Sequence, residues 1–119
     1  MAKILIIDDE KSIRLLLENT LKKKGEIITA GTGEEGFDLF IKEKPNLILL
    51  DIMLPDITGV ELLQKIRAKD KKVKVLMITA YSTLDSVIDL MDIKISGYIK
   101  KPFRIAEIRE KIDDILKKK

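Results

Sequence analysis

The sequence predicts an α/β fold in which a doubly wound, parallel, five-stranded sheet is covered by helices on both faces, giving three layers. Three observations predict it. Short apolar segments alternate with longer amphipathic segments along all 119 residues. The short segments are apolar on both faces, as in buried parallel strands. With 45% hydrophobic residues the chain can bury one core, so we expect a single domain over residues 1–119.

Runs rich in Ile, Leu and Val mark the strands. In chain order we expect them over Ile4–Ile7, Glu26–Ala30, Leu47–Leu50, Val75–Thr79 and, with the weakest pattern, Gly97–Ile99. Right-handed crossovers between these strands imply a parallel sheet covered on both faces. For five strands, the common doubly wound arrangement has the order 2-1-3-4-5.

Apolar residues at helical spacing mark the segments between the strands. We expect helices over Ser12–Lys24, Thr32–Glu43, Gly59–Lys69, Thr83–Met91 and Ile105–Leu116. Gly25 is placed to end the first helix. We expect the second helix to turn Phe37, Phe40 and Ile41 toward the core, and the fifth helix to turn Ile105, Ile108, Ile112 and Ile115 toward it.

The composition excludes several kinds of chemistry. The chain has neither Cys nor His, which rules out disulfides, thiol nucleophiles, the usual zinc sites and a phosphohistidine on this chain. The net charge of +3 comes from lysine-rich helix ends rather than an arginine-rich stripe. We therefore expect a cytoplasmic protein, monomeric or weakly dimeric, that binds neither nucleic acid nor a membrane.

Polar residues follow the strands at the end where parallel strands meet one crevice. Asp8 and Asp9 end the first strand, Asp51 the third and Thr79 the fourth, and Lys101 follows the fifth. Two carboxylates ~4 Å apart oppose each other by ~4 kcal/mol at an effective dielectric near 20. Such repulsion is tolerable if a cation binds there. Taken alone, Asp8 and Asp9 also fit a helix N-cap.

These side chains form an all-oxygen site suited to a hard cation. Mg²⁺ fits best, with Mn²⁺ as an alternative. An aspartate facing such a cation can attack phosphorus and form an aspartyl phosphate. Asp51 is the natural choice because it lies between the acidic pair and Thr79 and Lys101.

The fragments "IIDDE", "LLDIMLPDITG", "MITAYS" and "YIKKPF", in this order, resemble the receiver domain of bacterial two-component response regulators, a flavodoxin-like fold. Within that family, the chain is similar to the single-domain regulators of sporulation phosphorelays and to receivers of the nitrogen-regulator type. The resemblance implies that Asp51 accepts phosphate from a sensor histidine kinase or a histidine phosphotransferase and signals to a downstream protein. It also implies roles for other residues: Asp8, Asp9, Asp51 and the Met53 carbonyl bind Mg²⁺, Thr79 and Lys101 contact the phosphoryl group, Tyr98 changes rotamer, and Lys101-Pro102 is a cis peptide.

The resemblance implies a signalling domain that catalyses only its own phosphorylation and dephosphorylation. We expect no output domain after the last helix, so the chain acts alone or is the isolated receiver of a multidomain transcription regulator. A haloacid dehalogenase-type phosphatase is the enzyme alternative, but it needs an Asp where this chain has Met53. A flavodoxin-like electron carrier would need a phosphate-binding loop in place of "DDEKSIR".

Four apolar residues are candidates for docking the phosphodonor beside Asp51: Ile13, Leu16, Pro102 and Phe103. The alternative is that Ile13 and Leu16 simply face the sheet. Gly31 and Gly36 stand where the family more often has other residues, and Lys94-Ile95 stands where it commonly has Gly-Ala.

Overall fold

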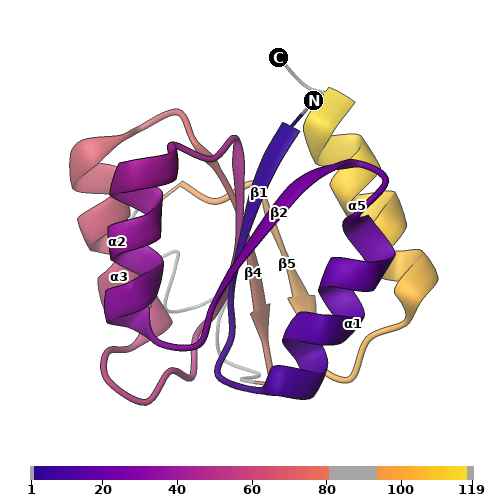
Figure 1. Cartoon of the computed structure of the whole chain (residues 1–119), viewed down its shortest axis with the longest axis horizontal. Helices are drawn as coiled ribbons and strands as arrows, with labels where there is room; N and C mark the ends of the chain where they lie inside the picture. The colour runs from indigo at the N-terminus through magenta and orange to yellow at the C-terminus, as the bar shows by residue number, and fades with distance from the viewer. Residues whose placement is uncertain (1, 81–93, 118–119) are drawn as a thin grey trace.

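The computed structural model describes residues 2–80 and 94–117 and has the three predicted layers (Figure 1). The strands are β1 (Ala2–Ile7), β2 (Gly25–Ala30), β3 (Leu47–Asp51), β4 (Lys74–Thr79) and β5 (Gly97–Lys100). They form one parallel sheet in the order β2-β1-β3-β4-β5, which confirms the predicted order.

Four helices lie within the described residues: α1 (Lys11–Leu21), α2 (Gly33–Glu43), α3 (Gly59–Lys69) and α5 (Ile105–Lys117). The helix expected over Thr83–Met91 lies outside them. None of the described helices is long and apolar enough to cross a membrane.

Alternate residues of the central strands face opposite layers. Ile4 and Ile6 of β1 pack with α1 and α5, which lie on one side of the sheet (Figure 1). Leu5 and Ile7 pack on the other side, where α2 and α3 lie. Both clusters are almost free of solvent, so each strand is apolar on both faces because both faces are covered.

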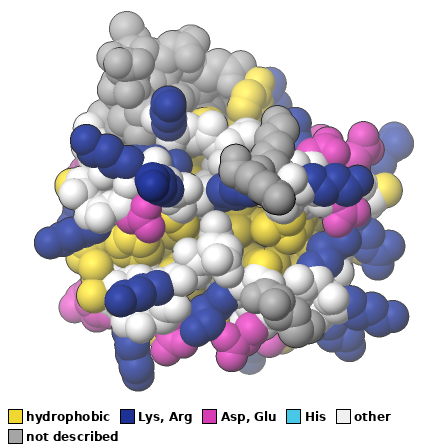
Figure 2. All heavy atoms as spheres, turned by 90° about the horizontal axis from the view of Figure 1, so that it is seen from above, with side chains coloured by type: hydrophobic (Ala, Val, Ile, Leu, Met, Phe, Trp, Pro, Cys, Tyr) yellow, Lys and Arg dark blue, Asp and Glu magenta, His cyan; other side chains and the backbone are white. Residues whose placement is uncertain are grey.

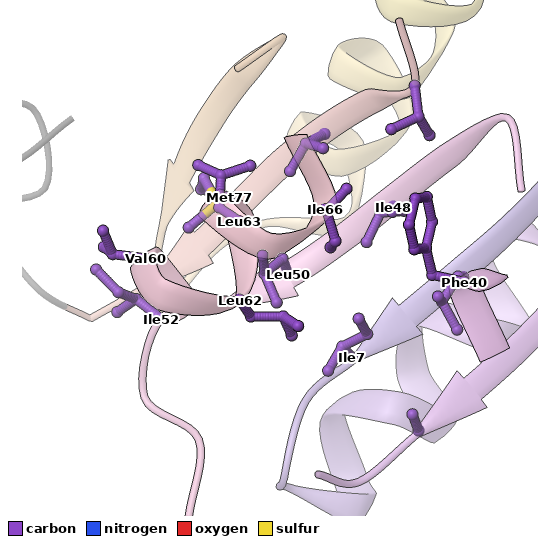
Figure 3. Close-up of a cluster of buried hydrophobic side chains, with 14 residues drawn as sticks. Ile7, Phe40, Ile48, Leu50, Ile52, Val60, Leu62, Leu63, Ile66 and Met77 are labelled. Atoms are coloured by element: carbon purple, nitrogen blue, oxygen red, sulfur yellow. The ribbon is translucent and has the colours of Figure 1, made fainter. Parts of the chain in front are cut away.

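The cluster beneath α2 and α3 is shown in Figure 3. Leu62, Leu63 and Ile66 of α3 reach the sheet, as their spacing predicts. Gly36 of α2 lies directly on β1: a Cβ added there would lie 2.6 Å from Ile7 Cδ1. The absence of a side chain at Gly36 therefore lets α2 approach the sheet closely, which accounts for glycine at a weak helix position.

Two apolar residues assigned to the core are exposed instead. Ile41 of α2 is 46% exposed and Ile105 of α5 is 40% exposed. Their helical neighbours Phe40 and Ile108 are buried as predicted. Ile41 is one position past the core-facing residue, and Ile105 is the first residue of its helix, where fewer neighbours cover the side chain.

The prediction that Gly25 ends the first helix is wrong. The helix ends at Leu21, and Gly25 is the first residue of β2, opposite Ala2. A Cβ at Gly25 would lie 2.1 Å from the Ala2 carbonyl oxygen. Glycine is needed here for the close approach of two backbones, and no described glycine has a positive φ.

Charged side chains of both signs lie at the end of the sheet where the strands begin. Figure 2 views the molecule from this end, and Lys and Arg side chains alternate with Asp and Glu side chains around the face. Lys44, Lys72 and Lys74 line a surface hollow of about 600 Å³ there.

Substituting two strand glycines tests this packing. We expect Gly25→Ala to lower the free energy of unfolding by about 1–3 kcal/mol, because the new methyl group must displace the backbone of β1. Gly97→Ala is the matched control: its Cβ would lie 3.6 Å from Leu76 Cδ1, an ordinary contact, so stability should stay equal or rise by about 0.5 kcal/mol. The measurement is urea denaturation, and equal losses in both variants would contradict this account.

Candidate functional site

The predicted polar residues meet at the carboxyl ends of β1, β3 and β5. Asp8 follows β1, and its N–H donates to the Ala30 carbonyl at 3.1 Å. Asp51 is the last residue of β3, the strand beside β1. Asp8 and Asp51 are 2% and 4% exposed, so the sheet buries two carboxylates that are far apart in the sequence.

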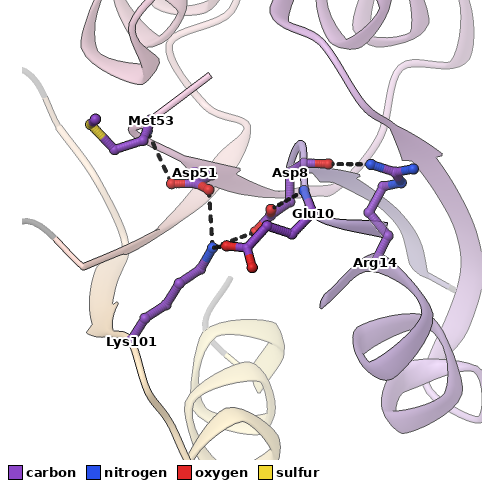
Figure 4. Close-up of polar contacts among 6 residues, drawn as sticks. All are labelled: Asp8, Glu10, Arg14, Asp51, Met53 and Lys101. Atoms are coloured by element: carbon purple, nitrogen blue, oxygen red, sulfur yellow. Dashed lines mark hydrogen bonds and ion pairs between the residues drawn. The ribbon is translucent and has the colours of Figure 1, made fainter. Parts of the chain in front are cut away.

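The Lys101 ammonium joins these carboxylates (Figure 4). Its Nζ donates to Asp8 Oδ2 at 2.9 Å, to Asp51 Oδ2 at 3.0 Å and to Glu10 Oε1 at 3.1 Å. Lys101 follows β5, and the peptide bond between it and Pro102 is cis, as the family resemblance implies. One cation thus reduces the carboxylate repulsion that the sequence predicts.

Burial and pairing act in opposite directions on these groups. Burial lowers the pKa of Lys101, but the hydrogen bonds to Asp8, Asp51 and Glu10 outweigh burial, so its pKa lies above the usual value. Burial raises the pKa of Asp8, and this exceeds the lowering by the Glu10 N–H and by Lys101. Lys101 is therefore a cation at neutral pH, and charging Asp8 in this buried site costs free energy.

Backbone groups hold the remaining carboxylate oxygens. The Glu10 N–H donates to Asp8 Oδ1 at 2.9 Å, and the Met53 N–H donates to Asp51 Oδ1 at 3.0 Å. The N-cap of α1 is Glu10, whose side chain accepts no capping hydrogen bond. The alternative assignment of Asp8 and Asp9 as helix caps is therefore wrong.

The acidic groups are close enough to share a cation. Asp8, Asp9, Glu10 and Asp51 each offer an oxygen, and these atoms lie within 4.8 Å of one another. Asp9 and Glu10 are exposed, whereas Asp8 and Asp51 are buried. A donor set of carboxylate oxygens alone, open to water on one side, fits a hard divalent cation.

Sequence reasoning missed two residues of this site. Glu10 was not assigned a role, although it directly follows the acidic pair. Arg14 Nη1 donates to the Asp8 carbonyl at 2.7 Å. A Cβ at Gly31 would lie 3.1 Å from that same Nη1. Gly31, where the family more often has another residue, was therefore the sequence feature that could have pointed to Arg14, because the missing side chain leaves room for the guanidinium.

The other predicted site residues are only partly described. Thr79 ends β4 opposite Lys100, and its side chain lies outside the described part of the structure. Tyr98 of β5 is partly buried against the cluster of α2 and α3. Met53 is 57% exposed, directly beside the acidic cluster.

The four candidate docking residues do come together. Ile13, Leu16, Pro102 and Phe103 line one surface pocket of about 420 Å³, together with Glu10, Ala80 and Lys101. We call this the apolar pocket. Because Glu10 and Lys101 also belong to the acidic cluster, the pocket directly adjoins it. Ile13 also packs partly against the core cluster of α1 and α5.

Comparison with known sequences identifies relatives over nearly the whole chain. Residues 4–113 match the model of the response regulator receiver domain family. The chain is 36% identical over 115 residues to sporulation initiation phosphotransferase F of Bacillus subtilis, covering 96% of this chain and 93% of that protein. It is 39% identical to the probable transcriptional regulator ycf27 of Porphyridium aerugineum, covering 98% of this chain but only 48% of that protein.

The fold is also similar to solved structures. The response regulator TrrA of Thermotoga maritima, solved in complex with Mg²⁺-BeF, aligns with a TM-score of 0.86 and 38% identity. The alignment covers 97% of this chain and 99% of that one.

Removing the Lys101 charge should leave two buried carboxylates without their cation. We expect Lys101→Met to lower the free energy of unfolding in metal-free buffer by about 3 kcal/mol, the low end for a broken buried pair, because the ammonium is partly exposed. Added Mg²⁺ should recover more stability in this variant than in wild type. Lys100→Met removes the same charge from an exposed neighbour and should change stability by less than about 0.5 kcal/mol. Equal melting curves for the two variants would show that Lys101 does not hold the cluster together.

Proposed function

The chain belongs to the response regulator receiver domain family, and from that premise we propose that Asp51 is its phosphoacceptor. The donor is a phosphohistidine on a sensor histidine kinase or histidine phosphotransferase, which implies action in the cytoplasm. The phosphorylated domain then signals to a downstream protein or passes the phosphoryl group on. Relatives of nearly equal length and of about twice the length both contain this unit, so the proposal concerns the receiver unit itself.

Mg²⁺ is the proposed cofactor, held by Asp8, Asp9, Asp51 and the Met53 carbonyl. The cluster of carboxylate oxygens supports this assignment, as does the Mg²⁺-BeF complex of the related regulator TrrA. When bound, Mg²⁺ would neutralise charge on the carboxylates and on phosphoryl oxygens. Mn²⁺, another cation suited to oxygen ligands, is the proposed substitute.

The transfer is a nucleophilic substitution at phosphorus. A carboxylate oxygen of Asp51 attacks the phosphorus atom, the P–N bond to the donor histidine breaks, and an acyl phosphate forms. The electron pair of the broken bond stays on the imidazole, which takes up a proton when it leaves. Hydrolysis of the acyl phosphate later restores Asp51 and releases inorganic phosphate.

Lys101 is the residue proposed to stabilise the added charge. Its ammonium lies 3.0 Å from Asp51 Oδ2, so a phosphoryl group on that carboxylate would be within its reach. Thr79, at the end of the neighbouring strand, and Tyr98 of β5 are the proposed switch residues that respond to the new group. The buried contact between Asp51 and Lys101 is the observation that carries this proposal, together with the family match.

The apolar pocket is the proposed docking surface for the phosphodonor. Ile13, Leu16, Pro102 and Phe103 would contribute apolar contact area, and the adjoining acidic cluster would supply the chemistry. The haloacid dehalogenase-type phosphatase gains no support. Met53 occupies the position where that mechanism needs an Asp, and the Met53 side chain is largely exposed.

Labelling with a small phosphodonor tests the acceptor. With acetyl phosphate and Mg²⁺, the wild-type protein should gain one phosphoryl group, seen by mass spectrometry and lost on treatment with hydroxylamine as an acyl phosphate must be. Asp51→Asn should abolish the gain, whereas Asp38→Asn, at an exposed carboxylate of α2, should leave it intact. Undiminished labelling of Asp51→Asn would remove Asp51 as the acceptor.

A second pair of variants tests the docking surface. We expect Ile13→Ala to slow transfer from the cognate phosphodonor protein about tenfold, equivalent to ~1.4 kcal/mol of lost docking, and to leave acetyl phosphate labelling unchanged. Leu15→Ala is the matched control, because Leu15 lies on the same helix, is 50% exposed and does not line the pocket. Slower labelling of Ile13→Ala with both donors would indicate a damaged site instead, and unchanged transfer would exclude Ile13 from the docking surface.

A further inference from the structure

A carboxylate from a distant loop holds the N-terminus of α2. Asp56 lies in the loop of residues 52–58 between β3 and α3, which we call the acceptor loop because it directly follows Asp51. Asp56 Oδ1 accepts from the Gly33 N–H at 2.8 Å and Oδ2 accepts from the Glu34 N–H at 2.9 Å. Two N–H groups that a helix leaves unpaired at its start are thus satisfied from another part of the chain.

The contact is charged as well as hydrogen-bonded. The two N–H groups of α2 lower the pKa of Asp56, so its carboxylate is ionised at neutral pH. A negative charge at a helix N-terminus also interacts favourably with the helix dipole. The cap from the helix's own sequence is separate: Thr32 Oγ1 accepts from the Glu35 N–H at 3.1 Å.

The acceptor loop is tied to the phosphoacceptor at its other end. The Met53 N–H donates to Asp51 Oδ1 at 3.0 Å, and the Gly59 N–H donates to the Ile52 carbonyl at 2.8 Å. A Cβ at Gly59 would lie 2.5 Å from the Asp51 carbonyl oxygen, so the two ends of the loop nearly touch. Asp56 is three residues from Met53, within about 10 Å of extended chain, so movement of one constrains the other.

Where the acceptor loop meets α2, its Ile57 side chain packs against the core cluster of α2 and α3. A Cβ at Gly33 would lie 2.1 Å from Ile57 Cγ2, so the loop packs directly on the helix backbone. Beside that contact lies a surface hollow of about 380 Å³, lined by Phe37, Leu62 and Lys65 among others. Within the described residues, the other hydrogen bonds of the acceptor loop stay in the loop and its adjoining strand and helix. The Asp56 carboxylate is therefore the polar tie between this loop and α2.

We propose that Asp56 is a positioning residue of the phosphoacceptor site: by holding the first turn of α2, its carboxylate fixes the acceptor loop and thereby the Met53 backbone beside Asp51. The inference rests on the proposed function, since the Met53 carbonyl is a proposed Mg²⁺ ligand. If the loop is already held in place, the Met53 carbonyl is in position before the cation binds. Binding then does not have to order the loop. Losing the tie should therefore weaken Mg²⁺ binding, although Asp56 is not among the clustered carboxylates Asp8, Asp9, Glu10 and Asp51.

Calorimetric Mg²⁺ titration of the unphosphorylated protein tests this role. We expect Asp56→Ala to raise the Kd for Mg²⁺ about tenfold, the low end for groups that orient metal ligands. The Mg²⁺ concentration for half-maximal acetyl phosphate labelling should rise by the same factor. Titrations are made well below each variant's melting temperature, so that all variants compared are folded.

Two further variants separate positioning from stability and from charge. Thr32→Ala removes the other cap at the same helix end, so it should lower the melting temperature comparably and leave the Kd unchanged. Asp56→Asn removes the charge but keeps one acceptor oxygen, so its Kd should stay within about threefold of wild type if the hydrogen bond does the positioning.

Different results would overturn the inference and the function separately. A wild-type Kd in Asp56→Ala, or equal weakening by Thr32→Ala, would show that Asp56 only stabilises α2. Equal weakening in Asp56→Asn and Asp56→Ala would overturn positioning through the hydrogen bonds to α2, because the effect would then come from the charge of Asp56. Failure of wild type to bind Mg²⁺ or to label on Asp51 would instead overturn the proposed function itself.

Discussion

The pairing of one ammonium with three carboxylates is the interaction on which the site depends. Lys101, after β5, contacts Asp8, Glu10 and Asp51 at the ends of two other strands, and its charge compensates those of the two buried carboxylates, Asp8 and Asp51. In the proposed function, the same carboxylates hold a divalent cation and the same ammonium contacts a phosphoryl group. The ion pairs that stabilise the metal-free protein therefore use the same charged groups that would bind a ligand. A ligand at this site can thus change the pairing of Lys101 with the carboxylates.

The sheet order makes this pairing possible. β1 and β3 are neighbours, yet the chain leaves β1 toward α1 and β3 toward α3 on opposite faces (Figure 1). The crevice between the two departing loops lies where Asp8 and Asp51 end their strands. Because both faces of the strands are filled with Ile and Leu, the strand ends are where polar side chains can be placed without disrupting the core.

Glycines around the site let neighbouring segments of the chain lie close together. Gly33 and Gly59 lie where a Cβ would meet Ile57 or the backbone of Asp51, and Gly31 leaves room for Arg14 beside Asp8. The acceptor loop thus contacts α2 on one side, and on the other side its last residues meet the end of β3, where the loop begins. If Asp51 is phosphorylated as proposed, the new group would lie beside a loop that also contacts the first turn of α2.

The predicted strand order came from the arrangement common to five-stranded doubly wound sheets. Periodicity and residue chemistry along the sequence determined the strands, all helices of the described residues to within a few positions, and the acidic site with Asp8, Asp51 and Lys101. These follow from local patterns: apolar runs define buried strands, and polar residues that follow parallel strands must share one end of the sheet. Only the tertiary structure decided that Glu10 and Arg14 belong to the site, that Ile41 and Ile105 face solvent, and that Asp56 caps a helix other than its own. Each of these depends on the distance between segments far apart in the chain, and packing of the layers sets that distance rather than any spacing along the sequence.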